Sequence, residues 1–193
     1  MHSVNVGRRT LLMQLPLALA ACADTPPPRV FAPLKYDYLP PLRLNVGVID
    51  IGDAPDHGPL DAQSPAPPGP ALRQMVQDRL ATGGSTGRAV VTLDEAQIVR
   101  TGDTLDGTMA VHLDILGEDN FRAGHAEARV SRRTTGVDRD SLRTALYDMT
   151  RLMLADMNVE LEFQIRRTLK SILQDTAAEP APVPVQKQDL SAP

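Results

Sequence analysis

Two histidines in neighbouring predicted strands could carry chemistry in the middle of the chain. His112 and His125 flank Gly117-Glu118-Asp119-Asn120, which is typical of a four-residue turn between two strands. If the hairpin closes tightly, His112 lies directly opposite His125, with Asp114 and Glu127 nearby. Two imidazoles and a carboxylate can hold zinc. The alternative is a polar sheet face whose histidines simply titrate in water.

The other candidate for specific chemistry is Cys22, the only cysteine of the chain. Arg8 and Arg9 precede an apolar stretch over residues 11–21 that ends at this cysteine. This stretch is too short to cross a hydrocarbon core of ~30 Å, which needs about 20 residues. It fits the apolar region of a secretory signal peptide. With a single cysteine, no disulfide can form within the chain.

Leu19-Ala20-Ala21-Cys22 resembles the lipobox of bacterial lipoproteins. The resemblance implies cleavage between Ala21 and Cys22, a diacylglycerol on the Cys22 thiol and an acyl chain on the new amine. Several acyl chains, each contributing about 0.8 kcal/mol per buried CH₂, make a stable anchor. By analogy with lipoprotein sorting, Ala23 after the cysteine favours the outer membrane, facing the periplasm. The alternative is an ordinary secretory peptide or a short membrane anchor with a chance cysteine.

Proline placement predicts the domain boundaries. All 17 prolines lie at or before position 70 or at or after position 180. Proline-rich chain is extended and semi-rigid, and a tail rich in Ala, Pro and Gln favours disorder. We expect a signal peptide over residues 1–21, a tether over 22–41, a folded domain over 42–175 and a disordered tail over 176–193.

Hydrophobic periodicity predicts the first half of the domain. Residues 42–51 alternate between apolar and polar side chains and predict one strand. A helical apolar stripe from Leu72 to Leu80 predicts a helix that begins near Pro70 and ends at Gly83-Gly84.

The second half of the domain predicts three strands and a long helix. Residues 88–101 favour strand with a bulge or break at Asp94-Glu95, and residues 108–132 favour a hairpin. Asp140 or Ser141 can cap a last helix of near 35 residues, ~50 Å at 1.5 Å per residue. We expect a kink at Asn158-Val159. A two-layer domain of this size should not cover all of this helix, so its last turns are expected to project or to contact another subunit or partner.

The element order β-α-β-β-β-α predicts an α+β two-layer sandwich, with an antiparallel sheet of about four strands and two helices on one face. Losing Arg8 and Arg9 with the leader takes the formal charge from −4 to −6, which disfavours nucleic-acid binding. The chain lacks the sequence motifs of common hydrolases, metalloproteases and dinucleotide-binding enzymes. We therefore expect no enzyme activity and no cofactor.

The lipobox, the proline-rich tether and the long terminal helix together resemble small envelope lipoproteins. In topology the chain is similar to auxiliary lipoproteins of ABC-type intermembrane lipid-transport systems, and to the lipopolysaccharide-assembly lipoprotein of the outer-membrane translocon. The resemblance implies a non-catalytic accessory subunit that faces the periplasm and self-assembles through its terminal helix. The alternative is a free-standing ligand or metal binder that uses the polar sheet face around His112 and His125.

Overall fold

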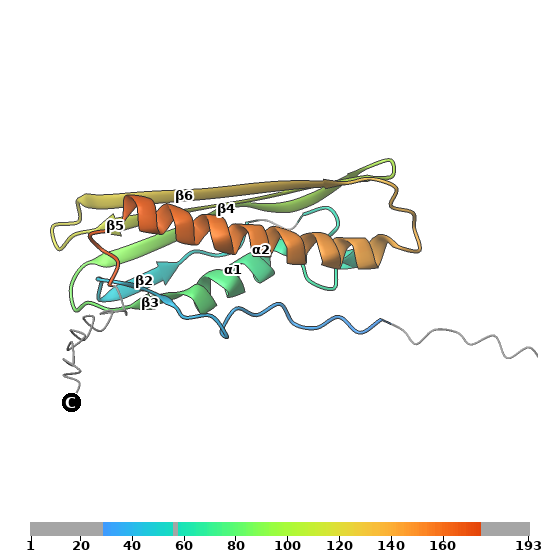
Figure 1. Ribbon diagram of the computed structural model, residues 1–193. Coiled ribbons are helices and arrows are strands. Elements are labelled where there is room, and N and C mark those ends of the chain that lie inside the picture. Colours follow the sequence, from blue (N-terminus) through green and yellow to red (C-terminus); the bar gives the residue numbers. More distant parts are fainter. Residues whose placement is uncertain (1–28, 56–57, 175–193) are drawn as a thin grey trace, which may run out of the picture. The chain divides into compact units, whose positions relative to one another are not determined.

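Three long antiparallel strands form one layer of the folded body, along one side of it (Figure 1). The computed structural model describes residues 29–55 and 58–174. Within this part, a short strand joins the three in parallel, so that the sheet order is β2-β4-β5-β6. The strands are β2 (Val48–Ile51), β4 (Arg88–Thr101), β5 (Thr104–Leu116) and β6 (Arg122–Thr134). The predicted bulge in β4 is confirmed, because the register with β5 shifts between Leu93 and Glu95.

The prediction of one strand over residues 42–51 is wrong, because two strands share this segment. β1 (Leu42–Leu44) pairs in parallel with β3 (Leu80–Thr82), and β2 then joins the larger sheet. The chain turns between them at Gly47, whose N–H donates to the carbonyls of residues 86 and 87. A Cβ on Gly47 would lie 2.8 Å from the Ser85 carbonyl oxygen, so only glycine fits there. Burial continues to alternate from Leu42 to Val46, and the sequence pattern therefore hides the break.

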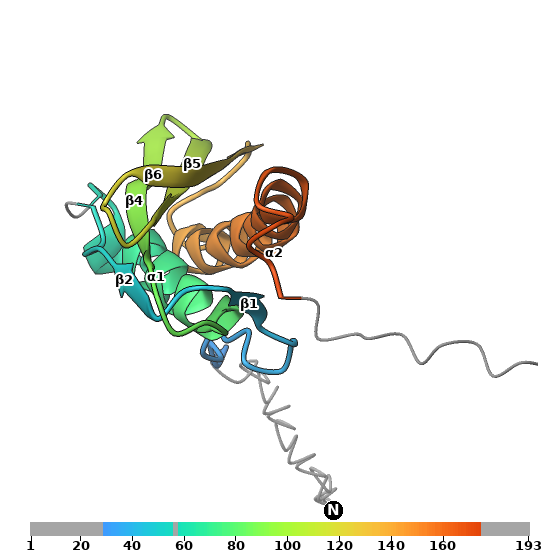
Figure 2. The same ribbon diagram turned by 90° about the vertical axis from the view of Figure 1, so that its left-hand side faces the viewer.

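Two helices cover one face of the four-stranded sheet (Figure 2). α1 (Pro68–Arg79) has proline in its first turn, as expected. It ends at Arg79 rather than at Gly83-Gly84, because Leu80 already belongs to β3. A 3₁₀ turn, η1 (Asp61–Gln63), precedes α1. The α+β fold class with a long C-terminal helix is confirmed.

The last helix, α2 (Leu142–Thr168), has 27 residues and is continuous through Asn158 and Val159. It is shorter than predicted because the chain leaves it after Thr168 and returns to β1. Asn45 N–H donates to the Ile172 carbonyl at 2.7 Å, and Leu173 bridges to Leu44. The last turns, which were expected to project or to contact another subunit or partner, bury apolar side chains within the chain instead. The buried apolar residues of the helix include Met149, Met153, Met157, Leu161 and Ile165.

Two glycines allow α2 to lie close against the sheet. A Cβ on Gly107 of β5 would lie 2.6 Å from the Met153 sulfur, and one on Gly124 of β6 would lie 2.5 Å from Leu169 Cδ2. Ala126 and Ala128 continue this row of small side chains and are buried. The large helix side chains thus fill the space that the small strand residues leave.

Residues before the predicted domain start also contact the body. Tyr36 is buried, and its N–H donates to Asp78 Oδ2 at 2.8 Å. Burial, with a smaller contribution from neighbouring Tyr38, raises the pKa of Tyr36 to about 12. Tyr147 donates its hydroxyl to the Ala32 carbonyl at 2.9 Å. The compact unit that contains the sheet starts at Phe31.

Arg79, the last residue of α1, is a buried cation that joins three segments. Its side chain is 4% exposed and forms an ion pair with Glu162 of α2 at 2.7 Å. Its Nε donates to Asn158 Oδ1 at 2.6 Å, and its Nη1 donates to the Pro40 carbonyl. One guanidinium therefore fixes α1, α2 and the N-terminal segment relative to one another.

Replacing this cation should destabilise the fold strongly. In Arg79→Ala, Asn158 and the Pro40 carbonyl lose the donor that Arg79 supplies, and Glu162 keeps only its half-exposed partner Arg166. We therefore expect the free energy of unfolding to fall by about 3 kcal/mol. Arg166→Ala is a matched control, because Arg166 pairs with the same Glu162 at 2.9 Å but is half-exposed. That change should cost at most ~0.5 kcal/mol. Urea unfolding of both variants measures the difference, and equal losses would contradict the role given to Arg79.

Candidate functional site

The two predicted site histidines lie on the exposed face of the sheet, but not directly opposite each other. His112 of β5 pairs with Glu127, and His125 of β6 pairs with Asp114. The predicted hairpin register is therefore wrong by two residues. The two histidines are diagonal neighbours, with ring centroids 5.8 Å apart.

The hairpin loop explains this difference. Gly117 and Phe121 close a loop of three residues rather than four, with Asn120 in the left-handed region at φ 64°. A second irregularity follows, because Leu116 pairs with Arg122 but Ile115 pairs with Gly124, which leaves Ala123 as an extra residue. The shorter loop and the extra residue Ala123 each shift the register by one residue. A total shift of two residues returns every side chain of β6 to its predicted face of the sheet. The apolar residues are therefore buried as predicted, although their cross-strand partners differ.

The bulge in β4 brings a carboxylate to the same face. Asp94 is the extra residue of the bulge, and its two carboxylate oxygens lie 2.9 and 2.8 Å from His112 Nδ1. The neighbouring Glu95 pairs with Arg129 of β6 at 2.9 Å. A bulge re-aims side chains in this way because two residues oppose one on the partner strand.

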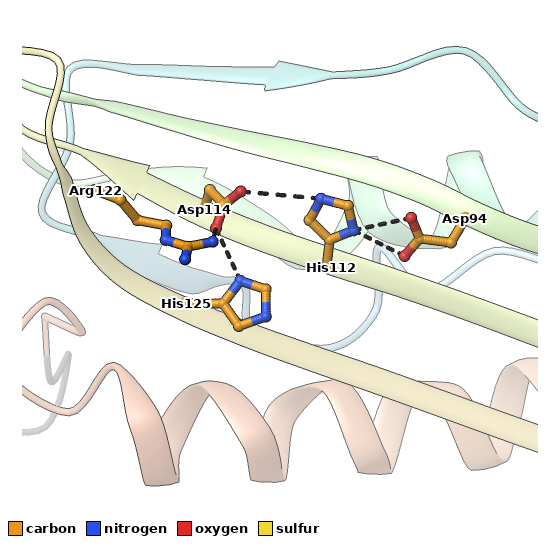
Figure 3. A network of polar contacts seen from close by, with 5 residues as sticks. All are labelled: Asp94, His112, Asp114, Arg122 and His125. Carbon is orange, nitrogen blue, oxygen red and sulfur yellow. Dashed lines mark hydrogen bonds and ion pairs between the residues drawn. The ribbon is translucent and has the colours of Figure 1, made fainter.

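Asp114 links the two histidines into one polar cluster, defined by Asp94, His112, Asp114, Arg122 and His125 (Figure 3). Asp114 Oδ1 lies 2.8 Å from His125 Nδ1 and 3.3 Å from an Arg122 nitrogen. Its other oxygen lies 3.9 Å from His112 Nε2. Each acid of the cluster thus has a basic neighbour, and the charges compensate within the strands.

The pKa of Asp114 is lowered by its neighbours. Partial burial acts to raise the pKa, but the hydrogen bonds and positive charges of His125 and Arg122 outweigh it. The carboxylate is therefore held in its charged form, which is the form that an ion-pair network needs.

The cluster does not assemble a metal site. Among the residues that the structure describes, no group of three or more His, Cys, Asp or Glu side chains is placed to hold a metal ion. The Nδ1 atoms of both histidines face carboxylates at hydrogen-bond distance. The geometry gives no support to the metal-binding alternative for His112 and His125.

The lipidation candidate Cys22 and the cleavage-site residue Ala21 lie outside the described residues. Asp94 and Arg122 complete the cluster but were not predicted as its members. The expected bulge at Asp94-Glu95 was the one sequence signal for Asp94. Within the described residues, no helix is long and apolar enough to span a membrane.

Comparison with known proteins gives weak likenesses only. No family model and no curated protein matches the chain. A protein of Xanthomonas campestris is 11% identical, with 68% of this chain and 88% of the other covered and a TM-score of 0.40. A minor lipoprotein of Acinetobacter baumannii is 12% identical, with 66% and 96% covered and a TM-score of 0.39. An uncharacterized lipoprotein B of Nitrosomonas europaea is 15% identical, with 65% and 86% covered and a TM-score of 0.33. TM-scores below 0.5 do not establish a common fold.

The lowered pKa of Asp114 predicts a specific loss of acid stability. A carboxyl whose folded pKa lies below its unfolded value of about 3.9 stabilises the fold above that value, and the contribution is lost as the pH falls through the folded pKa. Asp114→Asn should therefore be less stable than the parent chain at pH 7 and should lose less stability on acidification below about pH 4. Urea unfolding across this pH range tests it, with the exposed Asp37→Asn as control. Parallel pH profiles for the parent and Asp114→Asn would contradict the prediction.

Proposed function

We propose that the chain is a lipid-anchored envelope lipoprotein with a non-catalytic, accessory role. One observation carries the proposal: Arg8 and Arg9, an apolar stretch over residues 11–21 and the single cysteine at its end, in the order of a lipoprotein signal. A leader of this length is too short for a transmembrane helix. The chain offers no second cysteine that could give Cys22 a disulfide role instead.

The start of the folded unit limits the distance between the domain and the proposed lipid anchor. Because this unit begins at Phe31, only residues 23–30 separate it from the acylated cysteine. Eight residues reach at most ~28 Å when fully extended, at ~3.5 Å per residue. On this proposal the domain therefore works close to the lipid surface, in the periplasm.

A non-catalytic role fits the polar cluster. His112 and His125 are 30% and 42% exposed, and the Nδ1 atom of each lies at hydrogen-bond distance from a carboxylate rather than from a hydroxyl or thiol. A histidine that activates a nucleophile needs that group within hydrogen-bond reach of its ring. The finer proposal is an accessory subunit of an envelope transport or assembly complex, of the kind found in ABC-type lipid-transport systems. It rests on the resemblance in element order and on the lipobox.

The lipid anchor is tested on the full chain in a bacterial host. Inhibition of the lipoprotein signal peptidase should accumulate uncleaved precursor, and radiolabelled palmitate should enter the chain. Cys22→Ser should abolish the label and release the domain from the membrane fraction. Cys22 has no matched second cysteine, so Ser3→Ala in the leader is the control and should leave labelling intact. Normal processing under the inhibitor would refute the proposal.

The accessory role needs a separate measurement. Detergent-solubilised full chain should co-purify with a permease or substrate-binding component of a transport system, in a fixed ratio. Recovery of a monomer that carries bound lipid and no protein would favour the ligand-binding alternative. The membrane anchor would remain supported in that case, because the labelling experiment is independent of the partner.

A further inference from the structure

The outer edge of β6 is long and unpaired within the described residues. β6 pairs with β5 on one side and ends the sheet on the other. It has 13 residues, whereas β2 at the opposite edge has 4. A free edge presents a row of backbone N–H and C=O groups that can pair with another strand. β6 is therefore the natural place for a strand to be added.

A groove runs beside this edge, between β6 and α2. Its volume is about 400 Å³. It is lined on the strand side by His125, Glu127 and Arg129 and on the helix side by Glu160, Gln164 and Arg167. An extended segment that pairs with β6 has room to lie in this groove.

Charge does not protect the edge against pairing. Exposed charges commonly block edge strands, but the arginines of β6 are neutralised within the chain. Arg122 pairs with Asp114, Arg129 with Glu95, Arg132 with Asp156 and Arg133 with Asp106. Glu127 differs, because it makes no ion pair with the described residues. An added strand should therefore offer a cation opposite Glu127.

We propose that two copies of this chain pair through β6, antiparallel and about a two-fold axis at Ala128. Ala128 is the midpoint of the strand, so this register pairs all 13 residues of β6. It also places Glu127 of each copy opposite Arg129 of the other, whose 57% exposed guanidinium would be shared between that carboxylate and Glu95 of its own chain. Moving the axis by one residue brings Glu127 opposite Glu127, or Arg129 opposite Arg129, and like charges directly opposite are destabilising. Strand length and charge thus select the same register.

Exposed apolar side chains on α2 lie beside the same axis. α2 runs antiparallel to β6, since Gly124 faces Leu169 and Arg132 pairs with Asp156. The stretch of α2 alongside Ala128 therefore contains Val159 and Phe163, which are 67% and 53% exposed. In the two-fold pair both helices lie on the same face of an eight-stranded sheet, and these side chains approach the second copy. A symmetric, self-complementary patch is the usual form of a homodimer interface.

Charge reversal tests the register. Light scattering of the full chain in detergent should show a dimer. Glu127→Arg and Arg129→Glu should each raise its dissociation constant about tenfold or more, because each places two like-charge pairs across the axis. An equimolar mixture of the two variants should recover the dimer, since an edge with arginine at both positions then meets an edge with glutamate at both positions. Glu118→Arg makes the same charge change in the β5–β6 loop and should have no effect.

Two results would overturn the proposal. A chain that stays monomeric at all concentrations has no such interface. A dimer that Glu127→Arg leaves intact, but Phe163→Ser dissociates, assembles through α2 instead of β6. Circular dichroism and thermal unfolding of each variant separate a lost interface from a lost fold.

Discussion

The buried guanidinium of Arg79 constrains the arrangement of the whole body. A cation that is nearly inaccessible to water is tolerated only when its donors are satisfied and its charge is paired. Arg79 meets this demand with Glu162, Asn158 and the Pro40 carbonyl. These acceptors come from α2 and from the segment before β1. The helix pair and the segment just before β1 must therefore be in place together, and the contacts of Tyr36 with Asp78 and of Tyr147 with Ala32 hold the residues further upstream.

The two faces of the sheet are stabilised by different interactions. On the face under the helices, Gly107 lets Met153 of α2 approach the backbone and Gly124 lets Leu169 do so, and packing there therefore depends on small residues. On the other face, charged side chains compensate one another along and across the strands, with Asp114 between His125 and Arg122. Glu127 of the edge strand β6 differs, because it makes no ion pair with the described residues. The charges of this face are therefore compensated in the centre of the sheet more fully than at its β6 edge.

The sequence predicted what depends on periodicity and missed what depends on geometry. Alternation identified the three long strands and their buried faces, and prolines located the start of α1. The hairpin register was missed because two single-residue shifts around Asn120 and Ala123 cancel in their effect on the faces. The end of α2 was missed because Leu169 and Leu173 keep the helical spacing while the chain turns back to β1. The sequence did not indicate that Arg79 is buried, since an arginine at the end of an amphipathic helix usually faces solvent.

A membrane anchor and an edge-strand contact would reinforce each other. A single strand pair with two charge contacts and a few apolar side chains is a modest interface, and for freely diffusing copies the entropy of association would oppose it. If Cys22 carries the proposed lipid anchor, confinement to a lipid surface would reduce that cost, because anchored copies would share a thin layer and meet at a high effective concentration. Eight residues between the anchor and the compact unit would keep the domain within about 28 Å of that surface. A contact that is weak in solution can then be populated at the membrane, so the anchor would set the assembly state as well as the location.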